Sequence, residues 1–136
     1  MRFLLAVIVA AVTCAAPALG ASDPEQVEIP RGEGRLKAAL YRPAGDGPFP
    51  VVIGLHNCGG LNNRSDAIAS RYRDWGERLV KDGFAVLLPD SNGSRGLGNQ
   101  CRARNRPIRV ERERVADAHA ARVWVQQQPW AAPDRI

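Results

Sequence analysis

The sequence has 136 residues, of which 24% are charged, and a formal net charge of +5 at pH 7. A chain of this length forms one domain at most. Its two histidines and three cysteines do not gather into a metal-ligand motif, so neither a metal nor an organic cofactor is expected.

Residues 1–20 have the features of a secretory signal peptide. Arg2 precedes an apolar run at 3–12, and small residues follow at the expected cleavage site. The run is shorter than the about 20 residues that span a bilayer, so no membrane anchor is expected after cleavage. A lipoprotein modified at Cys14 is the alternative. We therefore predict an exported protein, periplasmic or secreted, whose mature domain occupies residues 21–136.

The mature chain begins with two expected strands, at 26–30 and 36–42. The glycines of residues 31–35 suit a hairpin turn between them, which predicts an antiparallel start. A loop rich in glycine and proline follows at 43–50.

Residues 51–55 form a short apolar run that predicts a buried strand, and it leads into the turn His-Asn-Cys-Gly-Gly at 56–60. Adjacent glycines let main-chain amides point into a cleft, where they can stabilise an oxyanion. The alternative is an ordinary strand-to-helix turn in which the glycines only relieve steric strain. The residues of this turn do not by themselves distinguish the two.

A helix is expected at 66–82, capped by Ser65 or Asp66 and closed by Gly83, with Gly76 weakening its interior. Its apolar stripe is expected to face the core and consists of Ile68, Tyr72, Trp75 and Leu79. A second apolar strand at 84–88 completes a βαβ unit, whose two strands should be parallel.

The long loop at 91–107 leaves the carboxyl end of this strand, where ligand crevices form in α/β sheets. A second helix is expected at 109–128, and residues 133–136 resemble the start of another strand. The apolar positions of this helix lie on roughly one side and are Val110, Val115, Ala118, Ala121 and Val125.

The order of these elements resembles the N-terminal half of an α/β hydrolase, most closely of the dienelactone hydrolase family. The resemblance rests on H-x-C-G-G at 56–60, L-P-D-S at 88–91, R-G-x-G at 95–98, D-A-x-x-A-x-x-W at 117–124 and P-D-R-I at 133–136. It implies an antiparallel start followed by a parallel βαβ sheet, and hydrolysis of a small ester or lactone.

The resemblance also implies roles for the turn residues. The main-chain amide of Cys58 would stabilise the oxyanion, with Asn57 and Gly59 shaping the hole. His56 and Gly60 would order the loop, and His56 would not be the catalytic base. The family usually has glycine at position 57, so Asn57 is expected in the left-handed conformation.

The nucleophile of this fold lies in a G-x-S-x-G or G-x-C-x-G turn, and this sequence contains neither. The catalytic triad is therefore missing, and His119 is interpreted as a solvent-facing helix residue. We expect residues 1–136 to be the front part of a longer protein, truncated before that turn and inactive alone. A short product that has lost activity is the alternative.

Cys58 and Cys101 would meet an oxidising compartment after export, which favours a disulfide, with two unrelated thiols as the alternative. The residues expected to line the substrate cleft are Asp90, Arg95 and Arg102. Seven arginines lie between positions 95 and 114, and a second hypothesis is a basic surface that binds polyanions. Surface pairs of Arg109 with Glu113 and of Glu111 with Arg114 would account for part of this charge. Nucleic acid is not an expected partner, and the sequence does not indicate an oligomeric state.

Overall fold

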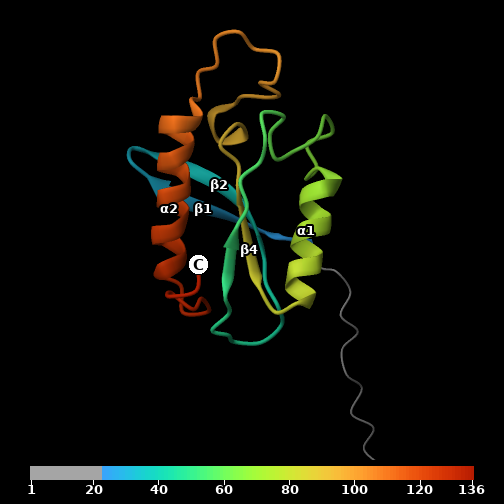
Figure 1. The fold of residues 1–136 in the computed structure, drawn as a ribbon, viewed down its shortest axis with the longest axis vertical. Helices are drawn as coiled ribbons and strands as arrows, with labels where there is room; N and C mark the ends of the chain where they lie inside the picture. The colour runs from blue at the N-terminus through green and yellow to red at the C-terminus, as the bar shows by residue number, and fades with distance from the viewer. Residues whose placement is uncertain (1–22) are drawn as a thin grey trace, which may run out of the picture.

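The computed structural model describes residues 23–136, so the predicted signal peptide at 1–20 lies outside the described residues. A mixed four-stranded sheet with the order β1-β2-β4-β3 forms the centre of the molecule. One helix covers each face of the sheet, as Figure 1 shows. The elements are β1 (Glu25–Arg31), β2 (Gly34–Tyr41), β3 (Val51–Ile53), α1 (Ser70–Lys81), β4 (Ala85–Pro89) and α2 (Val115–Gln126). Among residues 23–136, no helix is long and apolar enough to cross a membrane.

The predicted antiparallel start and the parallel βαβ unit are both confirmed. Strands β1 and β2 form an antiparallel hairpin, and Gly32 supplies the positive φ of +54° that its turn requires. Strand β3 is parallel to β4, and β4 is antiparallel to β2 on its other side. This arrangement places β4 between two neighbours with all five of its residues buried.

The two faces of the sheet carry separate apolar clusters because side chains alternate along each strand. Leu87 of β4 packs in the cluster under α2, whereas Val86 and Leu88 pack in the cluster under α1. The turns that follow β3 and β4 contact each other at the carboxyl ends of these strands, and the candidate site lies there.

Helix α1 starts later than predicted. Its N-terminal cap is Ala69, whose side chain makes no capping hydrogen bond, so the predicted caps Ser65 and Asp66 are wrong. The side chain of Asn63 instead organises the preceding loop, accepting hydrogen bonds from the amides of Ser65 and Ala67. The predicted closure by Gly83 is confirmed, with φ at +86°.

Three residues of the apolar stripe predicted to face the core pack against the apolar cluster under α1, namely Ile68, Tyr72 and Leu79. Trp75 was expected in the core but is 62% exposed. Gly76 is the buried residue of this helix, and it lies directly against the ring of Tyr41. The missing side chain of Gly76 thus makes room for an aromatic ring, which shifts the buried stripe away from Trp75.

We predict that Gly76→Ala destabilises the protein, although alanine is the better helix former by about 1 kcal/mol. A Cβ at position 76 would lie 2.8 Å from two ring carbons of Tyr41. Forcing extra volume into such a contact costs about 1–3 kcal/mol, so a net loss of about 1 kcal/mol is expected in urea denaturation. In a Tyr41→Leu background the same substitution should become stabilising, and a loss of equal size there would contradict this explanation.

The second helix is preceded by a π-helical turn at Val110–Arg114. Val110 and Val115 were expected on the buried side, but they are 60% and 47% exposed. The buried residues of α2 are Asp117, Ala121 and Val125, which are spaced four residues apart. The predicted positions Ala121 and Val125 are thus confirmed as buried, but the stripe continues to the acidic Asp117 and not to Val110 and Val115.

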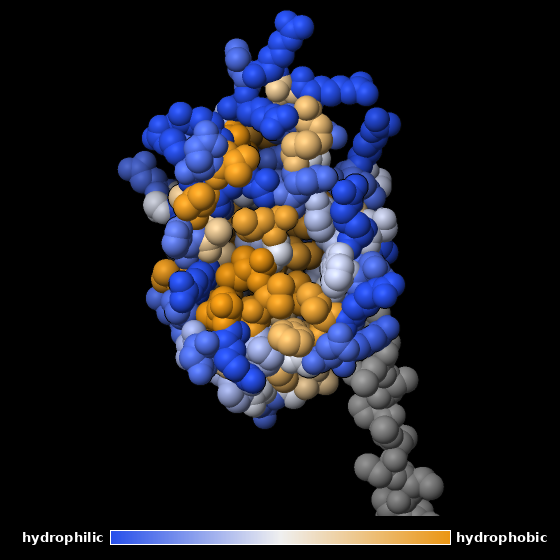
Figure 2. All heavy atoms as spheres, viewed as in Figure 1, coloured by the Kyte–Doolittle hydropathy of each residue, from blue (hydrophilic) through white to orange (hydrophobic). Residues whose placement is uncertain are grey.

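The last described residues run beside the free edge of β3. Phe49 and Ala131 form a parallel bridge, and the amide of Val51 donates to the carbonyl of Arg135 at 2.9 Å. Residues 133–136 thus begin the strand-like pairing that the sequence suggested. Figure 2 shows apolar side chains gathered over this part of the molecule, between the two helices. Leu55 is 45% exposed and lines a pocket together with Ile53 and Ile136.

Candidate functional site

The turns that follow β3 and β4 meet at the carboxyl edge of the sheet. The carbonyl of Cys58, in the first turn, accepts a hydrogen bond from the side-chain amide of Asn92, in the second, at 3.4 Å. The amide of Gln100 donates to the same carbonyl at 2.8 Å. Parallel strands end at one edge, which explains why residues distant in sequence converge here.

Asn57 gives the first turn its shape. Its side-chain oxygen accepts the amide of Gly59 at 2.9 Å, and its carbonyl accepts the amide of Gly60 at 3.2 Å. The expected left-handed conformation of Asn57 is wrong, because Asp66 is the only non-glycine residue with positive φ among residues 23–136. The side chain of asparagine closes this turn by a hydrogen bond, so it needs no unusual φ.

The amide of Cys58 is the one main-chain donor of residues 57–60 that has no acceptor within the described part of the chain. The amide of Asn57 donates to the hydroxyl of Tyr72 at 2.9 Å, and those of Gly59 and Gly60 bond to Asn57. A fixed donor without an internal acceptor suits an oxyanion hole.

His56 lies beneath this turn and is 2% exposed. Its Nδ1 donates to the carbonyl of Asn57 at 2.7 Å, and its own carbonyl accepts a hydrogen bond from Arg114. Its Nε2 lies 3.5 Å from a carboxylate oxygen of Asp90. Nε2 has no hydrogen-bond partner among the described residues, so the ring is held by Nδ1 alone, and its bond to the Asn57 carbonyl suits a residue that orders the turn.

Burial lowers the pKa of His56 below its ordinary value of 6.5, against the opposing effects of the Asn57 carbonyl and Asp90. Folded His56 therefore stays neutral at a pH where the unfolded residue already takes up a proton. By linkage, folding stability falls as the pH decreases below about 6.5, by up to about 1.4 kcal/mol per pH unit, until folded His56 protonates as well.

We predict that His56→Asn flattens this pH dependence, because asparagine keeps a donor near the Asn57 carbonyl but does not titrate. Urea denaturation between pH 7 and pH 5 measures the slope. His119→Asn is the matched control, since His119 is exposed on α2 as expected. Equal slopes in the wild type and in His56→Asn would refute the assignment.

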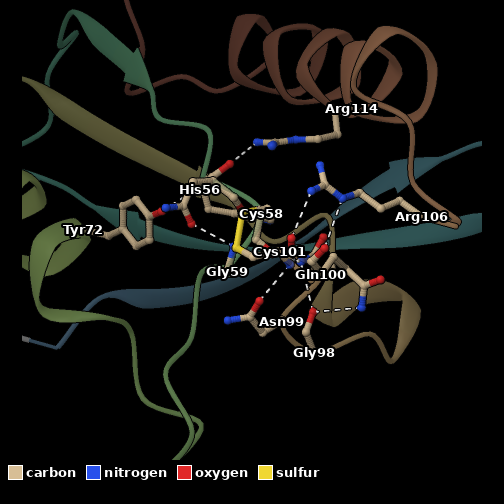
Figure 3. The surroundings of a disulfide bond; sticks show 12 residues. His56, Cys58, Gly59, Tyr72, Gly98, Asn99, Gln100, Cys101, Arg106 and Arg114 are labelled. Carbon is tan, nitrogen blue, oxygen red and sulfur yellow. Dashed lines mark hydrogen bonds between the residues drawn. A yellow bond between two sulfur atoms is a disulfide. The ribbon is translucent and has the colours of Figure 1, made fainter. Parts of the chain in front are cut away.

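A disulfide joins Cys58 to Cys101, with the two Cα atoms 4.8 Å apart. Figure 3 shows the bond between the β3 turn and the segment that carries Gly98, Asn99 and Gln100. Of the two alternatives that the sequence left open, the structure contains the bonded one.

Two of the three residues expected at the substrate cleft line a cavity of 840 Å³ at this edge, namely Asp90 and Arg102. Arg95 does not line it. Its guanidinium makes two hydrogen bonds to the carboxylate of Asp117, at 2.9 and 2.8 Å, and a third to the carbonyl of Ser91. Arg95 therefore holds α2 to the β4 turn, and its expected role in the cleft is corrected.

Other arginines of the basic stretch also serve structural contacts. Arg106 donates to the carbonyls of Gln100 and Cys101, and the predicted pair of Arg109 with Glu113 is present at 3.8 Å. The predicted pair of Glu111 with Arg114 is absent among the described residues, because Arg114 turns to the carbonyl of His56. These contacts fix the side chains of Arg106, Arg109 and Arg114, while Arg106 and Arg109 remain exposed.

Three residues of this region were not identified from the sequence: Tyr72, Arg114 and Asp117. Tyr72 was assigned to the core, and Arg114 to a surface pair. The burial of Asp117 could have been detected from the sequence. Asp117 lies four residues before Ala121 and eight before Val125, so all three share one face of the helix. Within residues 23–136, no three His, Cys, Asp or Glu side chains converge on a metal position.

Comparison with known protein families supports an α/β-hydrolase fold. Residues 32–135 match the family described as X-Pro dipeptidyl-peptidase (S15 family). The chain belongs to this family. It is an α/β-hydrolase family, so the predicted membership in that superfamily is confirmed. Among curated proteins, none matches the sequence.

Solved structures show the same fold. A dienelactone hydrolase from Anabaena variabilis is 21% identical, with a TM-score of 0.56, over 79% of this chain and 47% of that protein. A dienelactone hydrolase-like promiscuous phosphotriesterase from metagenomic libraries is 22% identical, with a TM-score of 0.62, over 82% and 45%. An esterase from Thermogutta terrifontis is 20% identical, with a TM-score of 0.58, over 85% and 40%. The chain thus spans less than half the length of each of these proteins.

Proposed function

We propose that this chain is the N-terminal half of an exported hydrolase that cleaves a small carboxylic ester or lactone. The observation that carries the proposal is the unoccupied amide of Cys58, held by its neighbours at the carboxyl end of β3. In this mechanism the amide donates to the oxygen of the tetrahedral intermediate while a serine or cysteine nucleophile attacks the carbonyl carbon.

The nucleophile, acid and base would come from a region that follows residue 136, since the structural neighbours are more than twice as long as the part that matches this chain. The pairing of Arg135 with Val51 supports this proposal, since it sets the chain parallel to β3 at the edge where the nucleophile-bearing strand belongs. The hydrolases among the structural neighbours support the substrate class. Residues 21–136 alone would not turn substrate over.

The first test is to sequence the coding DNA through and beyond codon 136. A frame that continues into G-x-S-x-G or G-x-C-x-G, followed by an acid and a histidine, is the expected result. The expressed product should hydrolyse a 4-nitrophenyl ester or a lactone. A verified stop at codon 137, or an intact triad without hydrolysis of either substrate, would refute the proposal.

Export is tested separately. Fractionation of the native host should place the protein outside the cytoplasm, with its N-terminus at residue 21. A cytoplasmic protein that retains Met1 would refute this part of the proposal and would leave the hydrolase assignment to the activity assay.

A further inference from the structure

The segment around Cys101 holds Cys58 at two atoms. The disulfide fixes the side chain of Cys58, and the amide of Gln100 donates to its carbonyl at 2.8 Å. Figure 3 shows both contacts approaching Cys58 from the same segment. The amide of Cys58, which has no internal acceptor among the described residues, is thereby left as its free polar group.

This segment is attached to the β3 turn by the disulfide and by the hydrogen bond from the Gln100 amide to the Cys58 carbonyl. Arg106 donates to the carbonyls of Gln100 and Cys101, which stabilises the segment internally. Its other hydrogen bonds to the preceding turn involve Asn92, which accepts from the amide of Leu97 at 3.0 Å and donates to Gly98 at 3.2 Å. Neither of these bonds reaches Cys58, so the disulfide and the single hydrogen bond from Gln100 are the links that hold the middle of the segment on Cys58.

We propose that Cys101 is a positioning residue for hydrolysis, acting through the disulfide to hold the Cys58 amide in the geometry that an oxyanion needs. The inference rests on the proposed function. Donors stabilise a transition state only when they are fixed before the reaction, and a misplacement of about 1 Å can cost up to about 100-fold in rate. Without the disulfide, the segment leaves the turn more often and the amide loses its fixed direction.

The test uses Cys101→Ser in the catalytically active protein. We expect kcat to fall about tenfold while KM stays within about twofold, because the interaction is made in the transition state. Affinity for a trifluoromethyl ketone analogue should fall by the same factor as kcat, because addition of the nucleophile to its carbonyl carbon converts the carbonyl oxygen into an oxyanion in the hole. Arg104→Gln is the matched control in the same segment, since Arg104 is exposed, and it should leave kcat and the affinity unchanged.

Reduction provides an independent readout. Dithiothreitol supplies two electrons and two protons, giving the thiols of Cys58 and Cys101 and the cyclic disulfide of the reagent. Cys101 is exposed and open to this reagent. Reduced wild type should match the kcat of Cys101→Ser, and the reagent should not change the variant further. An unchanged kcat in both would overturn the inference.

A failure of the proposed function gives a different pattern. If oxidised wild type hydrolyses no ester, the hydrolase proposal fails, and the positioning claim is then judged from the amide of Cys58 itself. Amide NMR of the oxidised and reduced wild-type chain should show a shifted Cys58 resonance and faster hydrogen exchange after reduction. Identical shifts and exchange rates would overturn the positioning role. The same measurement serves if Cys101→Ser does not fold.

Discussion

Replacing Asp117 by asparagine should lower the free energy of unfolding by about 3 kcal/mol. Asp117 is fully buried, and its carboxylate contacts the guanidinium groups of Arg95 and Arg31. Asparagine keeps the shape but removes the negative charge, which leaves two positive charges without a partner. The loss should lie at the lower end of the range for a broken buried pair, because the two arginine side chains keep 23% and 31% exposure.

Asp74→Asn is the matched control for this prediction. Asp74 pairs with Arg78 on the surface of α1, where both side chains are more than half exposed. Exposed pairs of this kind contribute about 0–1 kcal/mol, so the control should change the stability little. Urea denaturation of both variants at neutral pH gives the comparison. Equal losses of stability would show that Asp117 does not hold α2 to β1, which carries Arg31, and to the β4 turn, which carries Arg95.

In the active hydrolase, kcat of the variant Cys58→Pro should be two to three orders of magnitude lower than kcat of the variant Cys58→Ala. Proline removes the proposed oxyanion donor, since it has no main-chain N–H. That N–H has no internal acceptor among residues 23–136, so proline breaks no hydrogen bond of the described fold. The effect should therefore appear in turnover more than in the secondary structure measured by circular dichroism.

Cys58→Ala separates the role of the Cys58 amide as a donor from the role of the Cys58 side chain in the disulfide. Both variants lose the disulfide, but alanine retains the amide and should keep roughly one tenth of the wild-type kcat, in line with the loss expected for Cys101→Ser. Steady-state kinetics on a 4-nitrophenyl ester with all three proteins gives the comparison. Equal activity of the proline and alanine variants would remove the Cys58 amide from the oxyanion hole.

Much of the fold could be predicted because it depends on local patterns. The apolar runs before residues 56 and 89 predicted parallel strands, and their separation by one helix fixed the βαβ connection. The helical faces were harder, because hydrophobicity counts Trp75 as a core residue and cannot detect that Gly76 lies against Tyr41. Which apolar residue is buried depends on the partner it meets across the interface.

In the candidate site, too, local patterns were predictable and long-range contacts were not. The turn at 56–60 was located from its glycines and from the strand before it. The partners of its polar groups came from distant parts of the chain, as with Tyr72 and Arg114, and no local pattern specifies such contacts. The role of Arg95 was misjudged for this reason, because its charge suggested a substrate contact, whereas its partner Asp117 lies on α2, distant in the sequence.

The position of β4 between β2 and β3 has a consequence for the order of folding. The β1–β2 hairpin joins neighbouring residues, whereas β4 pairs with residues of β2 that lie far back in the sequence, such as Ala38 with Pro89. Closing that long loop costs entropy before any contact compensates for it, and such pairings slow folding. The hairpin can therefore form early, and the two apolar clusters can close only after β4 has entered the sheet. Insertion of β4 is thus the expected rate-limiting step of folding. Until it occurs, both faces of the β1–β2 hairpin remain exposed to solvent.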